Sequence, residues 1–254
     1  MIPYLSHEHP IRFAHRGSRV LWPENTMVAF QGAVDLGYIY IETDVHVTRD
    51  GRVVVFHDDT LERLTDGTGR FADHDWDDLR RLDAAHRFAP DDGFPLRGQG
   101  IGMPLLEEAV TTFPDRMFNI DLKQPGIAGA VAAEVERLGL EDRVMIGSFH
   151  DRRIRTFRRA APGVATSAGP AEVARALARR PRPGIGADAY QVPERGAGMR
   201  LVTERFVQRA HDAGKHVHVW TVDDADDMRR LLDLGVDGLV TDRPDVLNDV
   251  LGLG

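Results

Sequence analysis

The sequence predicts an α/β protein in which roughly eight strand-then-helix units close into a (β/α)8 barrel. Short apolar runs alternate with helix-like stretches along most of the chain. The 254 residues match the usual length of one such barrel, so residues 1–254 are expected to form a single domain. No G-x-G-x-x-G pattern follows the first apolar run, which removes the main support for a doubly wound, dinucleotide-binding sheet.

The first quarter of the chain predicts a strand, a helix and two further strands. A short apolar run over 11–14 predicts the first strand, and helical spacing over 26–36 predicts a helix that ends at Gly37. The next strands are expected over 38–47 and 52–56, because an Asp-Gly turn pair separates them.

The second half of the chain repeats a strand followed by a helix. The expected strands cover 116–122, 143–148, 164–168, 187–192, 216–222 and 236–241, and the expected helices cover 127–138, 151–161, 170–179, 203–213, 223–234 and 243–251. Strands that alternate with helices of this length pair in parallel. Asp242 and Arg243 are expected to cap the last helix.

Residues 59–103 interrupt this alternation. They are rich in Asp, Gly and Arg and show one short helical pattern, at Trp76, Leu79 and Leu82. A segment this long is not an ordinary connection between two elements. It is therefore expected to form a small inserted subdomain.

Charge and composition exclude several classes of protein. The chain has 32 basic and 40 acidic side chains, a net charge of −8, which argues against binding to nucleic acid or to anionic membranes. It has no cysteine, so any metal depends on oxygen or imidazole ligands. The N-terminus does not resemble a signal peptide, and no stretch is long and apolar enough to span a bilayer. A soluble, cytoplasmic protein is expected, with homo-oligomer formation left open.

Three acidic residues indicate a metal site. Glu42 and Asp44 lie two apart on one predicted strand, so their side chains share a face, whereas His46 is expected to point away from Asp44. Two carboxylates this close repel each other unless a proton or a cation intervenes. Asp121 ends the next barrel strand and can reach the same point. Three carboxylates suit a hard cation such as Mg²⁺ or Ca²⁺. The alternative interpretation is that Glu42 and Asp44 are a solvated acidic pair and that Asp121 is unrelated to them.

Two histidines and two basic residues also stand at predicted strand ends, where barrel side chains point into the active-site mouth. His15 and His57 can give and take a proton near neutral pH. Arg16 and Lys123 can bind phosphate oxygens, although either one alone is more simply an ion-pair partner of the nearby acids. Together with a metal, this combination points to cleavage of a phosphoester.

Two further features have both a structural and a functional interpretation. The segment 23–26, Pro-Glu-Asn-Thr, is typical of a helix start with Asn25 or Thr26 as its cap, and a supporting role in the site for Glu24 or Asn25 stays open. Trp220 either lines the substrate pocket or packs inside the barrel.

Several short motifs occur in a characteristic order from residue 11 to about 247. They are His15-Arg16-Gly17, Pro23-Glu24-Asn25-Thr26, Ile41-Glu42-Thr43-Asp44-Val45, Thr48-Arg49-Asp50-Gly51, Val54-Val55-Phe56-His57-Asp58, Leu61-Glu62-Arg63, Pro104-Leu105-Leu106-Glu107-Glu108, Asp121-Leu122-Lys123, Ser148-Phe149, Trp220-Thr221-Val222 and residues 238–244. In these motifs the chain resembles the glycerophosphodiester phosphodiesterases, and the match covers nearly its whole length.

This resemblance implies a TIM (β/α)8 barrel with an inserted subdomain after the second barrel strand. It implies one divalent cation, Mg²⁺ or Ca²⁺, held by three acidic residues, an acid/base pair of histidines, and phosphate contacts from two basic residues. In this chain these are, in the same order, Glu42, Asp44 and Asp121; His15 and His57; Arg16 and Lys123.

The chain departs from the family pattern at two of its positions. Asp121 stands where the family usually has glutamate, which brings direct metal coordination there into question. Asp223 stands where asparagine is common.

The expected reaction is metal-dependent hydrolysis of a glycerophosphodiester, a small-molecule substrate, to glycerol 3-phosphate and an alcohol. One alternative is lysophospholipase-D-like cleavage of a lipid diester at the same site. It requires an exposed apolar rim, for which Phe71, Trp76, Phe88 and Phe94 of the insertion are the candidates. The other alternative is a barrel that binds phosphate or metal without turnover.

Overall fold

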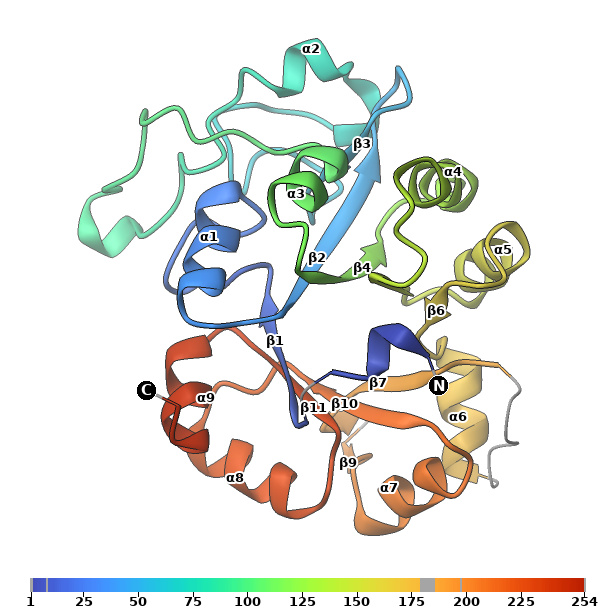
Figure 1. Ribbon diagram of the computed structural model, residues 1–254. Helices are drawn as coiled ribbons and strands as arrows, with labels where there is room; N and C mark the ends of the chain where they lie inside the picture. The colour runs from blue at the N-terminus through green and yellow to red at the C-terminus, as the bar shows by residue number, and fades with distance from the viewer. Residues whose placement is uncertain (1, 8, 179–185, 197, 254) are drawn as a thin grey trace.

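Eight parallel strands form a ring, and helices surround it (Figure 1). The computed structural model describes residues 2–7, 9–178, 186–196 and 198–253, so the expected end of one helix at residue 179 lies outside the described residues. The strands follow the order β6-β5-β4-β2-β1-β11-β10-β7, and a parallel bridge between Ser167 and Ala189 joins the two ends of this row. The predicted TIM barrel is confirmed.

Each barrel strand is short, and a helix follows it in the chain. The barrel strands are β1 (Ile11–His15), β2 (Tyr40–Val47), β4 (Met117–Leu122), β5 (Val144–Gly147), β6 (Ala165–Thr166), β7 (Ala189–Pro193), β10 (His216–Trp220) and β11 (Gly238–Thr241). The helices around them are α1 (Met27–Asp35), α3 (Leu106–Thr112), α4 (Ala128–Leu138), α5 (Asp151–Ala160), α6 (Pro170–Ala178), α7 (Glu204–His211), α8 (Ala225–Asp233) and α9 (Pro244–Leu251).

Strand β3 (Val53–Val55) differs from the others because it pairs antiparallel with the end of β2. The strand expected over 52–56 is therefore the return arm of a hairpin that extends beyond the barrel. The backbone N–H of Phe56 donates to the carbonyl of Asp44 at 3.0 Å, so the returning chain reaches the carboxyl end of β2 again. This return places His57 beside the mouth of the barrel.

Residues 59–103 lie between β3 and α3 and contain little regular structure. They include η2 (Phe71–Asp73), α2 (Trp76–Leu79) and η3 (Pro90–Asp92). Their apolar side chains form a cluster with two residues of the hairpin: Val54, Phe56, Leu61, Phe71, Leu79, Ala84 and Met103. Figure 1 shows this segment beside α1 and beyond β3.

The opposite end of the barrel is covered by the N-terminal segment. Its single turn, η1 (Pro3–Leu5), buries Tyr4 completely, and the hydroxyl of Tyr40 donates to the Tyr4 carbonyl at 2.6 Å. Tyr4 packs there with Ile11 and Phe13, which belong to the barrel interior. Two short strands, β8 (Arg195–Gly196) and β9 (Met199–Arg200), pair only with each other.

Candidate active site

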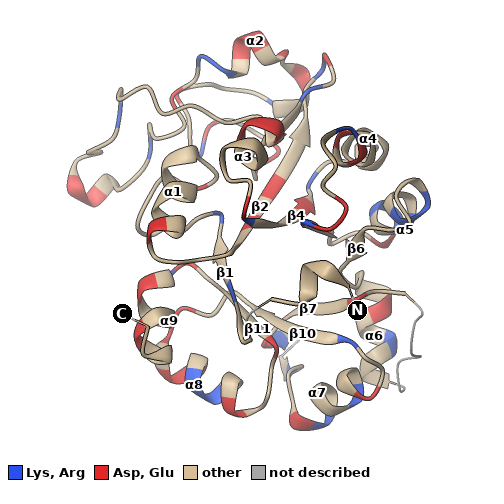
Figure 2. Cartoon of the chain, viewed as in Figure 1, with Lys and Arg blue, Asp and Glu red and all other residues tan. Residues whose placement is uncertain are grey.

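A pocket of about 560 Å³ lies at the carboxyl ends of the barrel strands. All eight residues predicted from the sequence to form the site line it: His15, Arg16, Glu42, Asp44, His57, Asp121, Lys123 and Trp220. The parallel register explains why the acids meet, because Asp44 of β2 lies directly opposite Asp121 of β4. Figure 2 shows acidic residues on both of these strands.

Lys123 lies between two of the three acids. Its Nζ is 2.6 Å from Oδ2 of Asp121 and 2.9 Å from Oδ1 of Asp44. Glu42 is further from these groups, and its Oε2 lies 3.8 Å from Nε2 of His15. Among the described residues, the only groups whose ligand atoms all fall within 4.8 Å of one another are His9, His216 and Asp237, which lie outside this pocket.

The buried carboxylates Glu42 and Asp44 differ sharply in pKa. Burial and, next to it, the neighbouring charge of Asp44 raise the pKa of Glu42 to about 7. Burial also disfavours the ionised form of Asp44, but Lys123 and Arg16 outweigh this effect and hold the pKa of Asp44 well below its usual value. The pair therefore retains a protonatable carboxyl that a cation would compete for.

The donor set fits a hard divalent cation. Glu42, Asp44 and Asp121 offer only carboxylate oxygens, the ligands that Mg²⁺ and Ca²⁺ prefer. Oδ1 of Asp121 is buried and has no hydrogen-bond partner among the described residues, and such an orphaned oxygen is costly unless a ligand satisfies it. The shorter Asp121 side chain is thus still available to a cation in this pocket.

His15 is held by Asp242, which is fully buried at the end of β11. Nδ1 of His15 lies 2.8 Å from Oδ1 of Asp242. Burial alone lowers the pKa of His15, but Glu42 and the hydrogen bond to Asp242 outweigh it and raise the pKa above the usual value. The expectation that Asp242 caps the last helix is wrong, because no side chain caps α9 and both carboxylate oxygens of Asp242 face other partners.

Replacing Asp242 with asparagine is expected to lower the pKa of His15. The neutral amide removes one of the two interactions that favour the protonated imidazole, so the ring loses its proton at a lower pH. The inflection assigned to His15 in a kcat/KM profile against pH should therefore move to lower pH. Asp245→Asn is the matched control, because Asp245 pairs with Arg243 instead. If the pH profile of Asp242→Asn were unchanged, Asp242 would not raise the pKa of His15.

His57 has a carboxylate partner of its own. Its Nδ1 lies 2.5 Å from Oδ1 of Asp58, and Asp58 is also bound by Arg63. Arg63 also forms an ion pair with Glu24, in which its Nη2 lies 2.7 Å from Oε1. The chain from Glu24 through Arg63 and Asp58 fixes the ring so that Nε2 is its nitrogen available for proton transfer.

Arg16 occupies a strained position at the start of the first loop. Its φ is 54°, in the left-handed region, and the following Gly17 has φ 82°. A Cβ on Gly17 would lie 2.6 Å from Ala29, so only glycine allows the loop to pass this close to α1. The guanidinium binds Glu24 at 2.7 Å and Asp44 at 3.0 Å. The geometry of this loop therefore places the guanidinium of Arg16 in contact with the carboxylates of Glu24 and Asp44.

The segment 23–26 combines both interpretations. Thr26 caps α1 by accepting from the N–H of Ala29, as predicted. Asn25, also in the left-handed region, donates from Nδ2 to Oδ2 of Asp44 at 2.9 Å. One side chain thus starts the helix while its neighbour holds a carboxylate of the pocket.

Two other predictions are corrected. His46 does not point away from Asp44: residues two apart on a strand share a face, and its Nε2 lies 3.1 Å from the carbonyl of His57. The apolar rim expected from the insertion is not formed by Phe71, which is fully buried, and Trp76, Phe88 and Phe94 do not line the pocket.

An apolar flank of the pocket comes instead from the loops after β5 and β6 and from α6. It consists of Phe149, Ala168, Pro170, Val173, Ala174 and Leu177. Phe149 also packs edge-on against Trp220, with ring centroids 5.3 Å apart. Trp220 therefore lines the pocket and supports its apolar side.

Asp223 has a structural role in this chain. Its Oδ1 accepts from the hydroxyl of Thr241 at 3.0 Å and from the N–H of Asp242 at 2.7 Å. The carboxylate therefore fixes the end of β11, the segment that presents Asp242 to His15.

A TIM barrel with such a mouth belongs to the hydrolases that cleave phosphate diesters. Residues 15–246 match the Glycerophosphoryl diester phosphodiesterase family, and the chain belongs to this family. It is 38% identical to a Mycobacterium tuberculosis protein named "Probable glycerophosphodiester phosphodiesterase 2", over 98% of this chain and 94% of that protein. It is 35% identical to a glycerophosphodiester phosphodiesterase of Bacillus altitudinis, over 92% and 94% of the two chains.

Solved structures agree with this assignment. The crystal structure of a glycerophosphodiester phosphodiesterase from Agrobacterium tumefaciens superposes with a TM-score of 0.76. The two chains are 27% identical, and the match covers 94% of this chain and 98% of that one. In the part of the chain that the structure describes, no helix is both long and apolar enough to cross a membrane.

Proposed function

We propose that the protein hydrolyses glycerophosphodiesters to glycerol 3-phosphate and an alcohol, with a divalent cation and two histidines. The observation that carries the proposal is the presence of two separately held imidazoles, His15 on Asp242 and His57 on Asp58, in the pocket that also contains the three acids. Two such groups allow one proton to be removed from the nucleophile and another to be given to the leaving alkoxide.

In this proposal the acidic residues of the pocket bind the cation and the basic residues bind the phosphate. Glu42, Asp44 and Asp121 would hold the cation, Mg²⁺ or Ca²⁺, which stabilises negative charge on a phosphate oxygen. Arg16 and Lys123 would bind the remaining phosphate oxygens, exchanging part of their present contacts with carboxylates. The nucleophile is either water or the 2-hydroxyl of the glycerol, and the leaving alkoxide would take up a proton from one of the imidazoles. Attack by the 2-hydroxyl would give a cyclic phosphate, which water would then open to glycerol 3-phosphate.

Residues 59–103 act in this proposal as an insertion that supports residues of the site without lining the pocket. Arg63 is the residue through which it does so, because its guanidinium joins Asp58, which holds His57, to Glu24, which holds Arg16. A single side chain of the insertion therefore touches the supports of both an acid/base group and a phosphate-binding group.

A lipid diester is the second candidate substrate, and the apolar flank favours it. Phe149 and Leu177 are exposed there, next to the polar mouth, and could accommodate an acyl chain. The cleavage chemistry would be the same, so only the substrate distinguishes the two proposals. A cytoplasmic location and homo-oligomer formation stay predictions from the sequence.

A panel of choline diesters tests both proposals. With Mg²⁺ present, glycerophosphocholine should yield choline and glycerol 3-phosphate in equal amounts, measured by separate coupled assays. Lysophosphatidylcholine in the same assay should yield choline only if the apolar flank accepts an acyl chain. Release of choline from the lysolipid alone would replace the first proposal with the second. A protein that cleaves neither diester, nor the ethanolamine and glycerol analogues, would refute both.

A further inference from the structure

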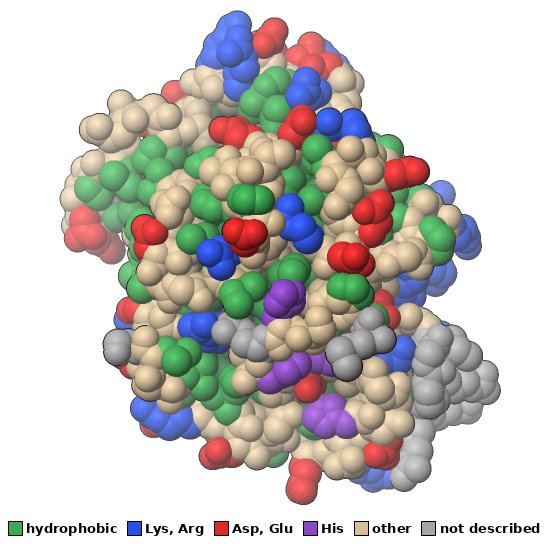
Figure 3. Space-filling model, in the orientation of Figure 1, with side chains coloured by type: hydrophobic (Ala, Val, Ile, Leu, Met, Phe, Trp, Pro, Cys, Tyr) green, Lys and Arg blue, Asp and Glu red, His purple; other side chains and the backbone are tan. Residues whose placement is uncertain are grey.

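The barrel end that faces away from the pocket carries a cluster of ionisable side chains with no part in the proposed reaction. His9 lies just before β1, His216 begins β10, and Asp237 lies just before β11. Trp220, at the other end of β10, lines the pocket, so the strand separates the two sites by about 13 Å at the usual rise per residue. Figure 3 shows histidine side chains gathered near the middle of this face.

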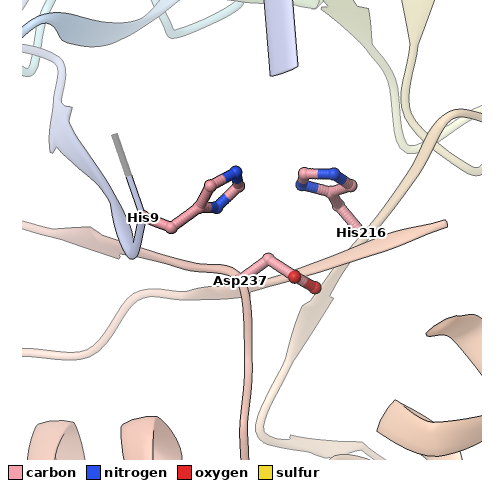
Figure 4. Close-up of side chains that lie close together, drawn as sticks. All are labelled: His9, His216 and Asp237. Carbon is pink, nitrogen blue, oxygen red and sulfur yellow. The ribbon is translucent and has the colours of Figure 1, made fainter. Parts of the chain in front are cut away.

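The three side chains converge on one point. One ligand atom from each lies within 4.8 Å of those of the other two. Figure 4 shows the two imidazole rings facing each other with the carboxylate of Asp237 beside them. The ring centroids of His9 and His216 are 5.3 Å apart. Groups this close together could hold one metal ion.

His216 and Asp237 each have one polar atom without a hydrogen-bond partner among the described residues. Nδ1 of His216 is buried and has no hydrogen-bond partner among the described residues. The hydrogen bonds to Asp237 fall on Oδ2, which accepts from the N–H of Val217 at 2.7 Å and lies 2.8 Å from Nε2 of His211. Oδ1 of Asp237 has no hydrogen-bond partner among the described residues. A ligand that bonds to this oxygen and to the buried nitrogen of His216 would satisfy both atoms.

Backbone hydrogen bonds on both sides hold Asp237 in place. The N–H of Asp237 donates to the carbonyl of Val217 and its carbonyl accepts from Ile11, each at 2.8 Å. His211 orients the carboxylate from outside, as hydrogen-bonded neighbours of metal ligands commonly do. His9, by contrast, is exposed and belongs to the N-terminal segment that covers the barrel.

We propose that His9, His216 and Asp237 form a second metal site, which binds a transition-metal ion of the Zn²⁺ class and fastens the N-terminal segment to β10 and the start of β11. Two imidazoles and one carboxylate suit Zn²⁺, Co²⁺ or Ni²⁺, whereas Mg²⁺ and Ca²⁺ prefer the all-oxygen set in the pocket. The two ends of the barrel thus select different ions. Because His9 comes from the N-terminal segment and the other two ligands come from the second half of the chain, the bound ion cross-links distant parts of the chain.

Thermal unfolding of the metal-free full-length protein tests this site with a readout that does not depend on activity. Millimolar Mg²⁺ is kept in all samples so that the pocket is occupied by its own ion. Zn²⁺ at about a hundredfold excess over its Kd should raise the Tm of the unchanged protein by about 5 °C. His9→Ala should abolish this shift, and its side chain is exposed, so the variant should fold normally without Zn²⁺.

Three comparisons decide the outcome. His7→Ala, a change of another exposed histidine in the same segment, should keep the full Zn²⁺ shift. Co²⁺ should give a visible absorption band in the unchanged protein that both His9→Ala and Asp237→Asn lack. The proposal is overturned if Zn²⁺ stabilises His9→Ala as much as the unchanged protein, or if the unchanged protein shows neither a Zn²⁺ shift nor a Co²⁺ band.

Discussion

Replacing either His15 or His57 with alanine is expected to lower kcat by about 10²–10⁴-fold, with little change in Tm. Each imidazole lines the pocket and makes one hydrogen bond to a carboxylate, Asp242 or Asp58, so its loss leaves no large cavity. The rate falls because the nucleophile keeps its proton or the alkoxide leaves without one. Steady-state release of choline from glycerophosphocholine measures the effect, and His86→Ala, in the insertion, is the matched control.

The two variants should respond differently to the leaving group. A diester of glycerol phosphate with p-nitrophenol releases a stable phenolate that needs no proton. The variant that lacks the general acid should therefore recover most of its rate on this substrate, whereas the variant that lacks the general base should not. Full activity of both variants on glycerophosphocholine would refute the two-histidine mechanism, and equal recovery of both would refute the division into acid and base.

The barrel itself could be predicted because its signals are local. Alternation of short apolar runs with amphipathic helices defines the strands and their parallel order, and the register then brings Asp44 opposite Asp121 without further information. The role of β3 was harder to predict. An apolar run after a turn reads the same in a hairpin as in a barrel strand, and only the pairing with β2 distinguishes them.

The supports of the site could not be predicted from patterns along the chain. His15 and Asp242 are 227 residues apart, and Asp242 sits where a helix cap is the simplest interpretation. Arg63 lies in the segment with the weakest periodicity, yet it joins Asp58 to Glu24. Such contacts arise from closure of the ring and from packing of the insertion, neither of which leaves a local signal in the sequence.

The cluster of two histidines and an aspartate at the other end of the barrel could not be predicted from the sequence either. His9, His216 and Asp237 come from three distant segments, and each precedes or begins a strand. Active-site residues of a barrel lie at the carboxyl ends of its strands, where Trp220 closes β10, so the sequence pattern assigns no role to His216 at the start of that strand. Only the closed ring brings these three side chains together.

Removal of divalent cations is expected to abolish the phosphodiesterase activity, by at least about 10³-fold, without unfolding the protein. Lys123 and Arg16 already neutralise Asp44, so the pocket keeps balanced charge in the chelated protein and its Tm should fall only slightly. Activity without a cation should be low because Glu42, with a pKa raised to about 7, is left partly protonated, and the phosphate loses the charge of the metal ion and keeps only Arg16 and Lys123. Millimolar Mg²⁺ or Ca²⁺ should restore the rate.

Variants of the three acids test where that cation acts. Glu42→Gln should raise the Mg²⁺ concentration for half-maximal activity by at least about tenfold, because it removes one anionic ligand. Asp121→Glu restores the residue that the family usually has and should lower that concentration, since the longer side chain reaches further into the pocket. Glu108→Gln, an exposed change on α3, should have no effect. Full activity after exhaustive chelation, or the same Mg²⁺ dependence in Glu42→Gln as in the unchanged protein, would show that these carboxylates do not hold a catalytic metal.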